Sequence, residues 1–252
     1  MMQRSDLRIL AAAVLSVAFG AGSRAEAGLV LTVEKPGVQE TSVEGVTTET
    51  FDEQNEGYFY GLGTAVGKIV TSGRIQPADQ YGGAGGVGQY LTVNPGFGTN
   101  TLTLLLDGPQ AFFGFWWSAA DQGNNVDFYS EGNLVGHFDS SATLAFLDNE
   151  YYGNPTKPFF GKNSGEPYAY LNIFGTDGTT IDQVVFTNTE KGTGFEMDNW
   201  STRGKPVDPF PGTPIPGGLS AVPEPGSFAM IAIGGAGLLA RRMRKRNVLA
   251  AV

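Results

Sequence analysis

The 252-residue chain contains no cysteine and a single histidine, His137. Without cysteine the protein has no disulfide framework, no thiolate metal site and no thiol nucleophile. No G-x-S-x-G sequence is present either, so serine- and cysteine-based hydrolysis lack their usual nucleophiles. On a strand, the histidine points to the same face as Val135, which favours an ordinary strand residue over a general base.

Basic residues are scarce in the central part of the chain. Between Gly28 and Val222 there are 8 basic and 22 acidic residues, a net charge of −14. A surface that acidic repels nucleic acid and anionic lipid headgroups, so we expect no nucleic-acid partner. Because clustered carboxylates are hard oxygen ligands, Ca²⁺ remains a candidate cofactor, and no other cofactor is indicated.

Apolar runs long enough to interact with a membrane occur near the two ends of the chain. At the N-terminus, Arg4 and Arg8 precede an apolar run over Ile9–Phe19, and an A-x-A sequence follows. This pattern predicts a secretory signal peptide over residues 1–27. A first transmembrane helix is the alternative, but the apolar run is short and the small-residue site follows it in the right place. The predicted cleavage-site residues are Ala25, Ala27 and Gly28.

The C-terminus carries a pattern of three parts: a Pro-Glu-Pro turn, a short apolar run and a basic cluster. The two prolines keep the turn extended and accessible to a processing enzyme. The 15-residue span Gly226–Ala240 measures about 22 Å as a helix, at roughly 1.5 Å per residue. That length falls short of the ~30 Å hydrocarbon core, and the basic cluster is expected to stay cytoplasmic. The turn comprises Val222, Pro223, Glu224 and Pro225, and the cytoplasmic stop comprises Arg241, Arg242, Arg244, Lys245 and Arg246.

In this order and position, the three parts resemble the PEP-CTERM sorting signal of exported bacterial proteins. The resemblance implies export by the secretion machinery, a transient inner-membrane anchor through a single transmembrane sorting helix, and processing by an exosortase. It also implies a final location at the cell surface or in the extracellular matrix. An ordinary tail anchor or a buried core helix with a charged end are the alternatives, and the order of the parts favours the sorting signal.

Between the two ends, glycine, aromatic and β-branched residues indicate short strands rather than helices. Turn sequences such as Glu131-Gly132-Asn133 separate several of them. This spacing predicts an all-β fold, an antiparallel β-sandwich with a jelly-roll-like arrangement. A helical turn is expected only at Ala142–Leu147, capped by Asp139, Ser140 or Ser141. The expected strands are Leu29–Val33, Thr47–Phe51, Val66–Thr71, Gln89–Val93, Thr101–Leu106, Ala111–Ser118, Asn125–Ser130, Leu134–Phe138, Tyr168–Phe174, Ile181–Thr187 and Gly194–Thr202.

The domain organisation follows from these features. The long loop Asp148–Glu166 is of a length that is usually functional or mobile. After Arg203, five prolines predict a semi-rigid, extended spacer. The expected segments are a signal peptide (1–27), a β-sandwich ectodomain (28–203), a Pro-rich linker (204–221), the sorting signal (222–246) and a short tail (247–252).

A second resemblance covers most of Phe51–Trp200. The segments Gln80–Gly88, Phe113–Asp121 and Gly194–Asn199 are similar to the ectodomain of one group of PEP-CTERM surface proteins. That group has no assigned reaction, so the resemblance supports fold and location alone. More loosely, the strand count and the Asp198-Asn199 pair resemble galactose-binding-like sandwiches, which is a likeness of fold and not of function.

Two aromatic pairs are candidates for glycan binding, because exposed aromatic faces stack on sugar rings. Trp116 and Trp117 are adjacent, so on a strand they face opposite sides. A place in the sandwich core is the alternative interpretation for both tryptophans. Tyr151 and Tyr152 lie in the long loop. For this pair, packing against the domain and contact with a ligand are both open interpretations.

Two acidic groups are candidate calcium sites, with solvated turn residues as the alternative for each. The first lies in a glycine-containing loop, and the second lies near the last strand. The first departs from the EF-hand pattern, which needs a glycine at the sixth position and a distant glutamate. The candidates are Asp121, Asn124, Asn125, Asp127, Glu196 and Asp198.

The expected function is that of an exported, non-enzymatic structural protein associated with exopolysaccharide, with no catalytic residues. A carbohydrate-binding module, with calcium as a candidate stabilising ion, is the first alternative. A glycoside-acting enzyme is a minor one, since a carboxylate pair for that chemistry needs only two acids at the right separation and the domain has many.

Overall fold

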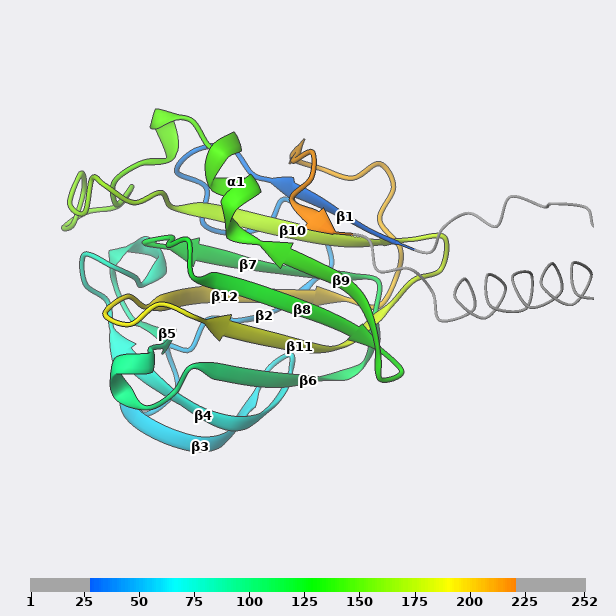
Figure 1. Cartoon of the computed structure of the whole chain (residues 1–252), viewed down its shortest axis with the longest axis horizontal. Coiled ribbons are helices and arrows are strands. Elements are labelled where there is room, and N and C mark those ends of the chain that lie inside the picture. The colour runs from blue at the N-terminus through cyan, green and yellow to red at the C-terminus, as the bar shows by residue number, and fades with distance from the viewer. Residues whose placement is uncertain (1–27, 221–252) are drawn as a thin grey trace, which may run out of the picture.

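The structure is a computed structural model that describes residues 28–220 (Figure 1). Over these residues the chain forms an antiparallel sheet of 14 strands with one short α-helix and three 3₁₀ turns. The predicted all-β class is confirmed. The predicted signal peptide and sorting helix lie outside the described residues. Within residues 28–220, no helix is long and apolar enough to span a bilayer.

The elements agree closely with the expected ones over most of the chain. The strands are β1 (Gly28–Val33), β2 (Thr47–Glu49), β3 (Gly57–Thr64), β4 (Gly67–Pro77), β5 (Gln89–Val93), β6 (Thr101–Gln110), β7 (Phe112–Ser118), β8 (Asn124–Ser130), β9 (Asn133–Asp139), β10 (Ala169–Thr176), β11 (Ile181–Asn188), β12 (Phe195–Arg203), β13 (Thr213–Pro214) and β14 (Leu219–Ser220). The helices are α1 (Ser140–Phe146), η1 (Ala84–Gly86), η2 (Pro95–Phe97) and η3 (Asn149–Tyr151).

The sheet is curled, so that its two halves face each other. Its strand order is β13-β1-β10-β7-β12-β5-β4-β6-β11-β8-β9-β14, with β2 beside β12 and β3 beside β4. The bend lies at β4, where residues 74–77 pair with β5 and residues 67–69 pair with β6. Contacts across the interior join strands that are not neighbours in the sheet. The rings of Phe115 on β7 and Phe186 on β11 have centroids 5.6 Å apart, for example.

Aromatic side chains fill the space between the two halves. Phe113, Phe115 and Trp117 point inward from β7 and are fully buried. Phe186 and Trp200 stack beside them with ring centroids 5.1 Å apart and an interplanar angle of 7°. Burying each such side chain stabilises the fold by roughly 1.5–3 kcal/mol. This core is how a domain without disulfides gains its stability.

The opposite face of β7 is buried as well, because loops cover it. Trp116 packs on Tyr168 from the long loop, with ring centroids 5.9 Å apart. Phe112 contacts Phe174 of β10, and Phe174 in turn stacks on Phe210 at 4.8 Å. Burial on both faces explains why β7 reads as a nearly continuous apolar run instead of an alternating one.

The short helix forms where the sequence predicts it. The side chain of Asp139 accepts a hydrogen bond from the backbone N–H of Ser141 at 2.7 Å and so caps the helix. Leu147 is buried, and Leu144 packs against the core. The helix therefore follows β9 directly and turns the chain back over the end of the sheet.

The segment predicted as a semi-rigid, extended spacer pairs with the sheet over part of residues 204–220. β13 pairs with β1 and β14 pairs with β9, so this segment joins the two edges of the curled sheet. Ile215 donates its backbone N–H to the carbonyl of Leu31 at 3.0 Å, and its side chain is 5% exposed. Prolines at the edge of a sheet lose no ladder bond that the fold needs, so a Pro-rich sequence serves as an edge strand here.

Candidate functional site

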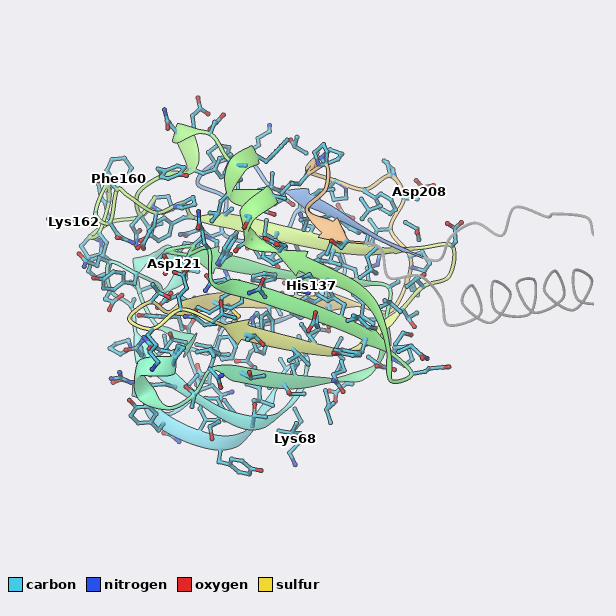
Figure 2. The ribbon with its side chains drawn as sticks, viewed as in Figure 1. Lys68, Asp121, His137, Phe160, Lys162 and Asp208 are labelled. Atoms are coloured by element: carbon cyan, nitrogen blue, oxygen red, sulfur yellow. The ribbon has the colours of Figure 1, made fainter. Side chains whose placement is uncertain are left out.

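Three chain turns meet at one end of the sheet, which we call the loop end. They are the turn 119–123 after β7, the turn 189–194 after β11, and the end of the loop 148–168. Asn124 joins the first two turns, because its Nδ2 donates to the carbonyl of Gly194 at 2.9 Å. The backbone N–H of Ala120 donates to the carbonyl of Pro167 at 3.0 Å and joins the first turn to the long loop. Figure 2 shows Asp121 at this end.

Four carboxylates gather at the loop end, and we call them the carboxyl cluster: Asp121, Glu166, Glu190 and Glu196. Asp121 follows Ala120 and Glu166 precedes Pro167. The hydrogen bond between Ala120 and Pro167 therefore brings the backbones of these two acids together. Glu190 lies against Gly123, where an added Cβ would stand 2.7 Å from the Glu190 Cγ. Glu196 is the register partner of Ser118 on β7, so both side chains lie on the same face of the sheet.

Burial and mutual repulsion weaken the acidity of this cluster. Desolvation raises the pKa of Asp121 to about 7, and the charges of Glu166 and Glu190 add to the rise. The pKa of Glu196 is raised well above its usual range, first by burial and then by the charges of Asp121 and Glu166. A neighbouring negative charge disfavours the ionised form of a carboxyl group, as burial does. The cluster can therefore hold protons near neutral pH or attract a cation.

Hydroxyl groups surround Glu196. Thr92 donates its Oγ1 hydroxyl to Glu196 Oε1 at 3.4 Å. Ser118 is fully buried, and within the described residues its Oγ has no hydrogen-bond partner. Burial raises the pKa of Tyr90 and of Tyr168, and the negative charge of Glu196 contributes to both shifts. The two tyrosine hydroxyls donate elsewhere, Tyr90 to Asp79 and Tyr168 to the carbonyl of Gln80, so Thr92 is the side-chain donor that reaches Glu196.

Asp198, also on β12, has a structural role. Its carboxylate accepts the backbone N–H groups of Ala84 and Asn199, each at 2.7 Å. Burial raises its pKa to about 8 in spite of these bonds. Asn199 donates its Nδ2 to the carbonyl of Gln39 at 2.7 Å. The pair Asp198-Asn199 thus fixes both the glycine-rich loop and the loop after β1, beside a hollow of about 430 Å³.

The first predicted calcium group does not converge on one point. Asn124 is buried, and its Oδ1 accepts from Trp117 Nε1 at 2.8 Å and from the Asp121 N–H at 3.1 Å. Asn125 donates its Nδ2 to the carbonyl of Gly123 at 3.1 Å. Asp127 instead lies on the solvent face of β8, where its Oδ1 is 2.6 Å from Nδ1 of His137 on β9 (Figure 2).

The structure regroups the acidic candidates. It brings Asp121 and Glu196 together, although the sequence placed them in different groups. Asp198 projects from the same face of β12 as Glu196, but its carboxylate is engaged by the backbone N–H groups of Ala84 and Asn199. In the part of the chain that the structure describes, no three acidic or histidine side chains are arranged to hold a metal ion. Calcium binding stays a prediction.

The structure corrects the tryptophan candidates for glycan stacking. Trp116 and Trp117 are both fully buried, one under the loops and one in the core, so neither ring face is open to a sugar. The alternative interpretation, that they pack in the interior, is the right one. Tyr151 is half-buried and donates its hydroxyl to the carbonyl of Glu34 at 2.9 Å. Tyr152 is half-buried, and its backbone forms a β-bridge with Pro167.

Sequence reasoning missed the aromatic side chains that are most open to solvent on the sheet. Tyr58 is 61% exposed and Tyr60 is 81% exposed, and both lie on β3, a strand that was not expected. The alternation that places them outward was present in Tyr58-Phe59-Tyr60. The glycines on both sides of it concealed the strand.

The sorting signal lies outside the described residues, and a comparison with known families tests it. Residues 221–245 match the family described as the PEP-CTERM protein-sorting motif. The chain carries a PEP-CTERM sorting motif. The match covers the predicted Pro-Glu-Pro turn, the apolar run and all but the last residue of the basic cluster. A PEP-CTERM motif implies export with a transient membrane anchor.

No curated protein matches the chain. Among solved structures, it is similar to the catalytic domain of a GH87 α-1,3-glucanase, as a point variant in complex with tetrasaccharides (TM-score 0.31, 13% identity, 73% of this chain and 30% of that chain). It is also similar to the catalytic domain of a GH87 α-1,3-glucanase in complex with nigerose (TM-score 0.30, 14% identity, 74% and 31%). The chain thus spans about a third of the length of these structures.

Proposed function

We propose that this chain is an exported, exosortase-processed protein that acts at the cell surface or in the exopolysaccharide matrix as a non-enzymatic structural component. The observation that carries this proposal is the PEP-CTERM match over residues 221–245, which begins directly after Ser220, the last residue of β14. In the proposal, the curled sheet is a jelly-roll-like sandwich whose aromatic core and acidic surface keep it folded and soluble outside the cell.

The register of the strands places Gly28 and Ser220, the first and last described residues, at the same end of the domain. Gly28 pairs with Thr176, next to the turn Asp177–Gly178. β14 runs antiparallel to β9, so after Ser220 the chain heads toward the turn Glu131–Gly132. Both turns lie opposite the loop end. In the anchored precursor, the carboxyl cluster is therefore presented away from the membrane.

The test replaces Pro223, Glu224 and Pro225 by alanine in the full chain and follows the protein in its host. We expect the variant to accumulate in the inner-membrane fraction at the mass of the unprocessed form, because the processing enzyme no longer finds its extended motif. The unchanged chain should leave that fraction. Equal distribution of the two proteins would refute exosortase processing.

The minor alternative is a glycoside-acting enzyme, and the observation that favours it is the pair of buried carboxyl groups Asp121 and Glu196, whose pKa values are both raised. The hollows beside the loop 34–42, of about 430 and 570 Å³, are lined by residues other than this pair. We expect no release of reducing sugar from polysaccharides by the purified protein. Release that Glu196→Gln abolishes would establish the enzyme instead.

A further inference from the structure

The hairpin of β3 and β4 presents aromatic side chains on its solvent face. Tyr58 and Tyr60 are two residues apart on β3, so they project from the same face, roughly 6.6 Å apart along the strand. Their exposed fractions are 61% and 81%. Phe59, between them, points inward and packs against the core. The hairpin thus holds two open phenol rings on a rigid strand.

The same face carries the positive charges of the hairpin. Arg74 is the register partner of Tyr58, and its guanidinium carbon lies 5.3 Å from the centre of that ring. Lys68 is opposite Gly63, which has no side chain to cover it, and it projects into solvent (Figure 2). We call the four residues Tyr58, Tyr60, Lys68 and Arg74 the hairpin face.

The charge of this face is opposite to that of the domain. Gly57–Pro77 contains two basic residues and no acidic one, whereas Gly28–Val222 as a whole has a net charge of −14. The nearest acids in the chain flank the hairpin: Glu53 and Glu56 lie in the turn that precedes β3, and Asp79 follows β4. An acidic polymer is therefore repelled by most of the surface and attracted to this face.

A further exposed aromatic side chain beside lysines lies in a different setting. Phe160 is 71% exposed, between Lys157 and Lys162. This segment belongs to the same loop as Glu150 and Glu166, and it borders the carboxyl cluster. The surrounding negative charge opposes an acidic ligand there. The hairpin face has no such neighbours on its own strands.

The edge of β3 is poorly shaped for pairing with a second copy of the chain. The register slips between Tyr60 and Leu62, so a bulge interrupts the strand. Gly57 and Gly61 have φ angles of 112° and 71°, which are outside the extended region. Bulges and irregular glycines bend an edge strand away from the flat geometry that strand addition needs. Side-chain recognition fits this face better than backbone pairing.

We propose that the hairpin face binds an acidic polysaccharide, with Tyr58 and Tyr60 stacking on sugar rings and Arg74 and Lys68 pairing with carboxylate groups. Tyrosine rings offer apolar faces to the C–H side of a sugar, and a guanidinium pairs with carboxylate through parallel hydrogen bonds. The inference rests on the proposed location of the protein in the exopolysaccharide matrix. It names a ligand class and a surface for that location.

The experiment uses the protein as its host exports it, with alginate and polygalacturonate as acidic probes and dextran as the neutral one. Affinity is measured by thermophoresis at low and high salt. We expect binding to both acidic polymers that weakens as salt rises, and no binding to dextran. Tyr58→Ala with Tyr60→Ala, and separately Lys68→Gln with Arg74→Gln, should each weaken binding at least tenfold. All four positions are on the surface, and near-ultraviolet circular dichroism checks that the variants fold.

Phe160→Ala with Lys162→Gln is the matched control and should bind like the unchanged protein. The inference is overturned by absence of binding to both acidic polymers, or by loss of binding in the control pair alone. It is also overturned if the tyrosine variant changes the sedimentation coefficient, or if phosphatidylglycerol vesicles bind through these residues and alginate does not. The intact mass of the same preparations shows whether the protein has been processed, so a failure of polysaccharide binding can be distinguished from a failure of the proposed function. If the protein is correctly processed but does not bind alginate or polygalacturonate, only this inference is refuted and the proposed function stands.

Discussion

At the scale of single residues, Asp121, Asp198 and Glu196 make the domain sensitive to pH in an unusual direction. Each has a pKa raised by burial, to about 7 for Asp121 and about 8 for Asp198. In the unfolded chain these groups lose their protons near pH 4, whereas the folded domain keeps them. The folded state binds more protons between those values, so stability falls as pH rises from about 4 to 8.

We therefore expect the unfolding midpoint at pH 5 to exceed that at pH 8.5 by about 3 °C or more, since 1 kcal/mol shifts a domain of this size by roughly 2–4 °C. In Glu196→Gln the difference should shrink, because one of the titrating groups is gone. Glu131→Gln, in an exposed turn, is the control and should keep the full difference. Calorimetry at a series of pH values measures both, and a midpoint that rises with pH would contradict the assignment.

Asn124 has a structural role, also at the scale of single residues, that the sequence does not reveal. Its side chain joins Trp117, the Asp121 amide and the Gly194 carbonyl. We expect Asn124→Ala to lower the free energy of unfolding by about 2–4 kcal/mol, because buried partners are left unsatisfied. Asn125→Ala removes one bond to a neighbouring carbonyl, so its cost should stay below about 1 kcal/mol. Chemical denaturation compares the two, and equal losses would show that Asn124 holds no special position.

At the scale of elements, the C-terminal segment 204–220 is part of the domain. Ile215 lies buried between the two edges that β13 and β14 join. We expect Ile215→Ala to cost about 2–4 kcal/mol of unfolding free energy, as for other buried large-to-small changes. Thr213→Ala, at an exposed position of the same segment, should stay within about 0.5 kcal/mol. If denaturant melts show no effect of Ile215→Ala, the segment is the detached spacer that its prolines suggest.

The sequence predicted most elements because their signals are local. Strands such as Gln89–Val93 and the Asp139-capped helix follow from alternation, turn residues and capping, which need no knowledge of distant parts of the chain. β3 was missed because its glycines read as a loop. β13 and β14 were missed because two-residue strands exist only through their partners β1 and β9. No local pattern encodes such a partner.

The candidate site was predicted less well, for a related reason. Trp116 and Trp117 suggest a binding surface in the sequence, but whether a ring is open depends on the loops that cover it. Asp121 and Glu196 are 75 positions apart in the chain, and only the pairing of β7 with β12 brings them together. The sorting signal, by contrast, is contiguous, so it could be identified from residues alone.

At the scale of the whole molecule, the domain and its processing signals are continuous. Gly28 begins β1 directly after the predicted signal-peptide cleavage site, and β14 ends at Ser220, where the PEP-CTERM match begins at residue 221. If the chain is processed at the predicted sites, only a few residues extend beyond the sheet at either end.

The intact mass of the native protein, isolated from its host together with its cell fraction, tests this account most directly. The account predicts a chain that begins at Gly28, ends near Pro225 and is recovered outside the cytoplasm. A cytosolic protein that retains residues 1–27 and the basic cluster would contradict it.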